Sequence, residues 1–248
     1  SNKAEKDELK LKLKKGHNQM SWNMRYPGPK LVPDLVSMVI NPNVSGPRAV
    51  PGSYIVRLSA GDKMEFTKGF EILRDPRWTD VEQADYQAQF DLVEEMKAMI
   101  TESHEVIKNL RAIRSQVTLM SKLSQDAGYS ENVKQAVEKL DVELTDVENL
   151  VIQNKAKTSQ DAINYPRVFT NHIGRLYGVL NNAQDKPTGG VLERYEDLDV
   201  EFEKIINDYQ HLIDEIMPAF NNLLDQEKVG RIIVPYAIQK NVVLPKRN

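Results

Sequence analysis

The hydrophobic pattern of the chain changes its period at Asp75-Pro76-Arg77. Before these residues, apolar side chains alternate with polar ones, which is typical of β-strands with one buried face. After them, apolar residues recur with alternating spacings of four and three, which is typical of helices in a bundle. The pattern therefore predicts an α+β chain of two domains, with strands in residues 1–78 and helices followed by an extended tail in residues 79–248.

The first domain contains several candidate strands. Leucines alternate with lysines in Leu9–Leu13, and large apolar residues alternate in Met20–Tyr26. A hairpin follows, with strands at Tyr54–Leu58 and Met64–Ile72, and Gly69 interrupts the second strand as a bulge would. Four to six antiparallel strands predict an immunoglobulin-like β-sandwich. This number of strands is small for such a domain, so we expect its first strands to lie upstream.

The second domain is predicted to be an antiparallel, heptad-packed bundle of three to four helices. Helical stripes follow Thr79, Ser130 and Pro166, and the last stripe starts at Val191 and is expected to kink at Pro218. Two layouts fit the lengths: three legs with a broken middle leg, which we favour, or four helices of unequal length. The apolar residues after 231 are broken by prolines and are expected to lie against the bundle as extended chain.

The residues around the change of period are expected to form a short, rigid joint. Pro76 lacks a backbone donor and ends strand pairing, while Thr79 and Glu82 fit a capping box at a helix start. The linker would then be about three residues long. Trp78 is expected to pack at the joint rather than to contact a ligand. The residues expected to shape the strand domain and the joint are Trp22, Arg25, Tyr26, Asp75, Pro76, Arg77, Trp78, Thr79 and Glu82.

Composition narrows the possible partners. The net charge of −3, from 33 basic and 36 acidic residues, gives no field that favours nucleic acid. The sequence has no cysteine, which excludes disulfides and thiolate metal sites. Its apolar runs are all shorter than the roughly 20 residues needed to span a bilayer. We therefore expect no nucleic-acid partner and no transmembrane segment in this chain. Because the chain lacks an initiator methionine, we expect it to be a processed or excised piece.

The sequence offers no pattern that specifies a reaction. The four histidines lack metal-ligand spacing, and the phosphate-loop, dinucleotide-binding and Gly-x-Ser-x-Gly motifs are missing. The acidic residues between Glu193 and Glu203 alternate with the helical stripe, which favours a solvated face over a glycosidase pair. His104 and His211 border the stripes and are interpreted as polar residues at their margins. We therefore assign no catalytic, cofactor-binding or metal-binding residue, and no cofactor.

Four blocks of the sequence carry a resemblance to a known family. They are Gly16–Pro27 (GHNQMSWNMRYP), Gly46–Leu58 (GPRAVPGSYIVRL), Phe70–Arg77 (FEILRDPR) and Ala84–Leu92 (ADYQAQFDL). These blocks resemble the region that follows the β-propeller in bacterial exported proteins with BNR (Asp-box) repeats, which are often labelled sortilin-like or glycosyl hydrolase. The first two blocks alone would also suit immunoglobulin-like domains of surface proteins. The likeness covers most of residues 16–184.

The resemblance implies a periplasmic, cell-surface or secreted protein whose upstream propeller carries any substrate site. No Asp-box pattern occurs in this chain, so no glycosidase residue can be carried over. The expected function is a non-catalytic accessory or interaction region, which packs against the propeller and displays a surface. One alternative is a carbohydrate- or protein-binding module that uses the loops at residues 26–33 and 41–51. Another is a glycoside hydrolase with a site between the two domains, which would need two carboxyl groups with shifted pKa values.

Overall fold

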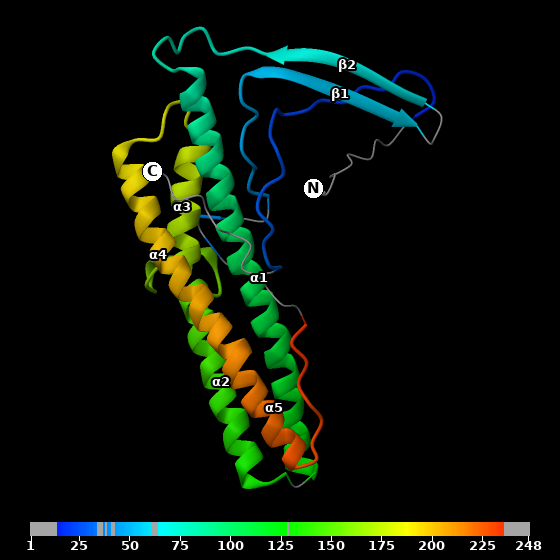
Figure 1. The fold of residues 1–248 in the computed structure, drawn as a ribbon, viewed down its shortest axis with the longest axis vertical. Helices are drawn as coiled ribbons and strands as arrows, with labels where there is room; N and C mark the ends of the chain where they lie inside the picture. The colour runs from blue at the N-terminus through cyan, green and yellow to red at the C-terminus, as the bar shows by residue number, and fades with distance from the viewer. Residues whose placement is uncertain are drawn as a thin grey trace.

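A long helical bundle with a β-hairpin beside one end forms the part of the chain that the structure describes (Figure 1). The structure is a computed structural model, and it describes residues 14–33, 37, 39–40, 43–60, 64–127 and 129–235. None of the described helices combines the length and apolar composition that crossing a bilayer requires.

The bundle has three legs, and its middle leg is broken. The first leg is α1 (Gln83–Ala127), whose 45 residues span about 67 Å. The middle leg consists of α2 (Glu131–Val151) and α3 (Phe169–Asn182), which pack one after the other along α1 (Figure 1). The third leg, α4 (Gly189–His211) and its continuation, packs against both parts of the middle leg. The favoured layout with a broken middle leg is therefore the one observed.

A side-chain hydrogen bond links the end of α2 to the start of α3. A short 3₁₀ turn, η1 (Ser159–Ile163), lies in the connection. The hydroxyl of Thr170, in the first turn of α3, donates to the carbonyl of Val151 at the end of α2 (2.6 Å). This bond satisfies one of the carbonyl groups that a helix end leaves without a partner. At the other end of α2, the hydroxyl of Ser130 accepts from the amide of Val133, as predicted.

The third leg changes its helix type directly before Pro218. A π-helical turn, η2 (Leu212–Ile216), leads into α5 (Met217–Gln226). The wider turn accommodates a proline that cannot donate to the preceding turn. It also adds a residue to the stripe, so that Met217 is buried and Ile216 only partly buried. A kink was predicted at Pro218, and what the structure shows there is a π-turn that leads into α5.

One hydrophobic core runs along the bundle, and two N-terminal residues and one tail residue join it. Val32 and Ile40 belong to the same cluster as the helical stripes, and so does Ile232. The backbone of the tail is held by the side chains of Asn221 and Gln116, which accept from the amides of Ile232 and Ile233 at 2.9 Å. The prediction of an extended tail is confirmed up to residue 235, and the rest of the tail lies outside the described residues.

The hairpin is formed by β1 (Gly52–Ala60) and β2 (Met64–Ile72), as the alternation predicted. The antiparallel register runs from Gly52 opposite Ile72 to Ala60 opposite Met64 without interruption. Gly69 pairs regularly with Ile55, so the predicted bulge is wrong.

The predicted immunoglobulin-like β-sandwich is also wrong, because the sheet in the described residues has only the two strands of this hairpin. The expected strand at Met20–Tyr26 is reduced to an isolated bridge between Arg25 and Arg48. Prolines 27, 29, 47 and 51 flank this bridge and remove the donors that a longer ladder needs. The expected strand at Leu9–Leu13 lies outside the described residues. The division of the chain at residue 78 stays a prediction.

Candidate functional site

The Asp75-Pro76-Arg77 joint is a turn held by one carboxylate. The amide of Trp78 donates to the carbonyl of Asp75 (3.1 Å), with Pro76 at the second position, where its fixed φ suits a turn. The Asp75 carboxylate accepts from the backbone amide of Arg77 (3.0 Å) and from its guanidinium (2.6 Å). These bonds lower the pKa of Asp75 to about 2. The motif therefore sets the local backbone and keeps its carboxylate ionised.

The helix after the joint starts later than predicted. β2 ends at Ile72 and α1 begins at Gln83, so the connection comprises residues 73–82 and the three-residue linker is wrong. The capping box between Thr79 and Glu82 does not form, because Asp85 accepts from the amide of Glu82 (2.9 Å) and Thr79 instead donates to Asp80. The positive end of the helix dipole also stabilises a carboxylate at this position.

Trp22 and Tyr26 hold the N-terminal segment against the hairpin and the bundle. The ring centroid of Trp22 lies 6.2 Å from that of Tyr54 and 6.3 Å from that of Phe70, on one face of the hairpin. Its indole donates to the carbonyl of Arg25 (3.0 Å). Tyr26 packs edge-on against Phe90 of α1. In contrast, Trp78 is 46% exposed, so the packing expected for it covers only part of the ring.

Arg25 anchors two distant parts of the chain. Its guanidinium donates to the carbonyl of Gly46 and to Oδ1 of Asn181 on α3, both at 2.9 Å. The amide group of Asn181 also donates to the carbonyl of Ser45. Gly46 permits this close approach, because a Cβ there would lie 2.1 Å from the carbonyl oxygen of Tyr26. The segments on both sides of the Arg25–Arg48 bridge are thereby fixed to the end of α3.

A cavity of about 440 Å³ lies where these segments, the base of the hairpin and α1 meet. Its lining includes Ile72, Leu73, Phe90 and Val93 on the apolar side. The polar lining residues are Arg48, Asp75, Tyr86, Gln89, Asn181 and Gln184. The amide group of Gln89 is already used, since it donates to the carbonyls of Leu180 and Ala183. A mostly apolar cavity with a few polar groups is typical of a small-molecule site.

The cavity does not match the chemistry of a glycoside hydrolase. Asp75 is the one carboxylate among the described residues that line it. A general acid needs a raised pKa, whereas the pKa of Asp75 is lowered by its bonds to Arg77. The described residues therefore give the inter-domain hydrolase alternative no pair of carboxyl groups here.

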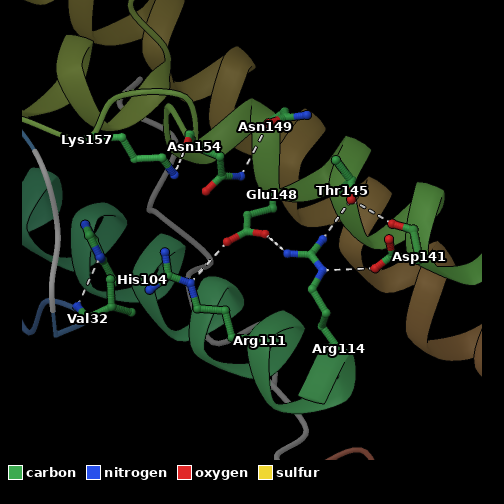
Figure 2. Close-up of polar contacts among 10 residues, drawn as sticks. All are labelled: Val32, His104, Arg111, Arg114, Asp141, Thr145, Glu148, Asn149, Asn154 and Lys157. Carbon is green, nitrogen blue, oxygen red and sulfur yellow. Dashed lines mark hydrogen bonds and ion pairs between the residues drawn. The ribbon is translucent and has the colours of Figure 1, made fainter. Parts of the chain in front are cut away.

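A second polar cluster joins α1 and α2 (Figure 2), and of its charged side chains only that of Glu148 is buried. Glu148 is buried at 2% exposure and accepts from the guanidinium groups of Arg111 (3.1 Å) and Arg114. Arg114 also binds Asp141 and the hydroxyl of Thr145. Each charge thus has a partner of opposite sign, and this arrangement is typical of a structural ion-pair network that joins two helices.

The two histidines at the stripe margins do not face each other. Nδ1 of the buried His104 accepts from the amide of Val32 (3.2 Å), while His211 is exposed and pairs with Glu215. Nε2 of His104 is buried without a partner among the described residues, and burial lowers the His104 pKa to about 4. The described residues contain no group of His, Asp and Glu side chains that could hold a metal ion.

The loops of the alternative binding module are packed against the bundle where the structure describes them. Val32, Gly46, Pro47 and Ala49 are buried. The hydroxyl of Tyr177 on α3 donates to the carbonyl of Ser45 (2.8 Å). These contacts fix both loops to the bundle, while Tyr26, Lys30 and Arg48 stay exposed.

Comparison of the chain with protein-family models, curated proteins and solved structures found no match. The resemblance to the BNR-repeat proteins therefore stays an expectation.

The structure brings together residues that the sequence did not connect. Asn181 and Arg25 are 156 positions apart, and no periodicity links a loop arginine to the last turn of a helix. Arg48 and Gln89 were also missed, although both lie within the quoted blocks. Of the expected residues, Asp75 and Pro76 line the cavity, while Thr79 and Glu82 do not.

Proposed function

We propose that this chain is a non-catalytic interaction region of a larger exported BNR-repeat protein, and that it acts by packing and display. Its partner in this proposal is the propeller domain expected upstream in the same protein. The observation that carries the proposal is the half-covered apolar face of the hairpin.

That face is formed by cross-strand neighbours. Trp22 contacts Tyr54 and Phe70 but leaves Phe70 40% exposed, and Val56, Leu58 and Phe66 beside them are 47%, 49% and 63% exposed. Exposed apolar patches of this kind often mark interaction surfaces. A two-stranded hairpin alone is only marginally stable in water, so a partner layer on this face would stabilise it.

The opposite face of the hairpin is mainly polar. It carries Ser53, Arg57, Glu65, Thr67 and Glu71, with Ile55 as its large apolar residue. Arg57 and Glu65 form an ion pair across the strands (3.3 Å). This asymmetry favours one partner surface over burial on both sides.

The proposal is tested by amide hydrogen exchange on this chain and on a longer protein that includes the preceding domain. We expect exchange in β1 and β2 to slow at least about tenfold in the longer protein, because the apolar face becomes covered. The double variant Leu58→Ser and Phe66→Ser should lose this protection, while the control Ile55→Ser on the polar face should keep it. Equal exchange rates with and without the preceding domain would refute the contact.

The non-catalytic part of the proposal has its own test. The chain is assayed for glycoside hydrolysis together with Asp75→Asn, which changes the one carboxylate found in the cavity lining. We expect no turnover from either protein. Turnover that disappears in the variant would contradict the proposal.

A further inference from the structure

Two arginines lie opposite each other at the base of the hairpin, and one of them, Arg48, lines the cavity. Arg25 and Arg48 are paired in an antiparallel bridge, and the bonds on either side of it run from Tyr26 to Pro47 and from Ala49 to Met24. This pattern defines a non-hydrogen-bonded pair, in which the two Cα atoms are about 4.5 Å apart and the side chains start close together. Two like charges directly opposite each other are unfavourable unless another group compensates them.

No carboxylate among the described residues forms an ion pair with either arginine. The guanidinium of Arg25 is bound by neutral acceptors, the Gly46 carbonyl and the Asn181 side chain. Burial and the nearby charge of Arg48 both lower the pKa of Arg25. The carboxylate in the cavity lining, Asp75, is already bound to Arg77. Arg48 therefore brings to the cavity lining a positive charge that no carboxylate among the described residues compensates, and Arg25 opposite it adds a second positive charge nearby.

The backbone at this edge is also strained. Met24, which lines the cavity and precedes Arg25, has a φ of 56°. A residue other than glycine adopts this left-handed conformation at an energetic cost, and such residues cluster at ligand sites. Met24 and Arg48 both line the cavity, so the strained backbone and the uncompensated charge lie at the same site.

We propose that this cavity binds a small organic anion, whose apolar body lies against Ile72, Phe90 and Val93 and whose acidic group pairs with Arg48. The volume of about 440 Å³ falls within the usual range for small-molecule sites. The apolar lining disfavours a bare inorganic anion, which would leave most of that surface uncovered. A carboxylate and a sulfonate both fit this role, because either accepts hydrogen bonds from a guanidinium.

Two fluorescent probes that differ in charge test this inference. Anilinonaphthalene sulfonate is anionic, and phenylnaphthylamine has the same aromatic body without the charge. We expect the intact chain to bind the anionic probe more tightly. Arg48→Gln should weaken its binding about fivefold, as the loss of one partly solvated ion pair predicts, and should leave the neutral probe unchanged.

Two variants locate the binding. Arg57→Gln removes the same charge from the polar face of the hairpin, away from the cavity lining, and should leave both probes unaffected. Ala183→Phe places a large side chain at a lining position and should weaken both probes. Circular dichroism and urea unfolding establish that each variant is folded.

The inference is overturned if Arg48→Gln binds the anionic probe like the parent chain, or if Arg57→Gln weakens it equally. It is also overturned if a folded Ala183→Phe variant retains full binding, since the probe then lies elsewhere, for example on the apolar hairpin face. None of these results bears on the proposed propeller contact, which uses a different surface and a different assay.

Discussion

The buried carboxylate of Glu148 offers a direct test of what joins α1 to the broken middle leg. Replacing it by glutamine keeps the size and shape of the side chain but removes the negative charge. Arg111 and Arg114 then face a neutral group inside the bundle, and each loses a charge-assisted hydrogen bond. We expect Glu148→Gln to fold and to be less stable.

The magnitude follows from the exposure of the three partners. Glu148 is almost fully buried, whereas the side chains of Arg111 and Arg114 are 41% and 27% exposed. A hydrogen bond to a charged group contributes about 1.5–3 kcal/mol, but water reaches both arginines and replaces part of it. Arg114 also keeps Asp141 and Thr145 as partners. The expected loss is about 2 kcal/mol, which corresponds to a fall in Tm of about 4–8 °C for a chain of this length.

The measurement is urea unfolding followed by circular dichroism, with thermal unfolding as a second readout. Glu138→Gln is the matched control, because Glu138 lies on the same helix and is exposed, and it should stay within about 0.5 kcal/mol of the parent chain. A Glu148→Gln variant as stable as this control would refute the reasoning, since it would mean that the carboxylate contributes no net stability.

Three further predictions concern other buried contacts. Because the His104 pKa lies near 4, below its usual 6.5, its contribution to stability is present above pH 6.5 and is lost as the pH falls towards 4. Glutamine does not titrate, so His104→Gln should make the free energy of unfolding depend less on pH over this range. An unchanged pH dependence would contradict the assignment. Thr170→Val removes the hydroxyl that closes the broken leg and should cost about 1–2 kcal/mol in urea unfolding, whereas no loss would mean that the bond contributes nothing. Gly46→Ala should accelerate hydrogen exchange at the Tyr26 amide, because its Cβ would collide with backbone, while Gly178→Ala in open space on α3 should not; equal behaviour of the two would contradict the close approach.

The helical part of the fold was readable because each helix buries one stripe. Spacings of four and three residues depend only on helix geometry, so residues such as Leu92, Met96 and Met99 could be assigned to the core before their partners were known. The length of α1 and the broken middle leg follow from the same regularity. The exception is η2, where a π-turn adds a residue and moves the stripe from Ile216 to Met217, which the simple spacing does not predict.

The strand part was harder to predict because alternation has more than one cause. Met20, Trp22, Met24 and Tyr26 alternate, yet in the structure Trp22 packs on the hairpin and Tyr26 on α1, without a ladder between them. Periodicity records which side chains are apolar and does not record which backbone groups are paired.

The cavity could not be predicted from the sequence for a related reason. It is assembled from residues near 48, 75, 90 and 181, and their proximity depends on how the N-terminal segment folds back onto α1 and α3. The Asp-Pro-Arg motif could be identified as a turn, but neither the Arg25–Asn181 contact nor the pairing of Arg25 with Arg48 follows from any spacing.

The uninterrupted helix α1 holds positions along its length at known distances from one another. Because the sequence has no cysteine, single cysteines can be introduced at exposed positions such as Ala84 and Thr118 and labelled without background. These positions are 34 residues apart on one helix, which corresponds to about 51 Å. A spin-label pair there should report one narrow distance distribution. The distances from these two positions to a label on a molecule bound at the hairpin would then show how far along α1 that molecule lies.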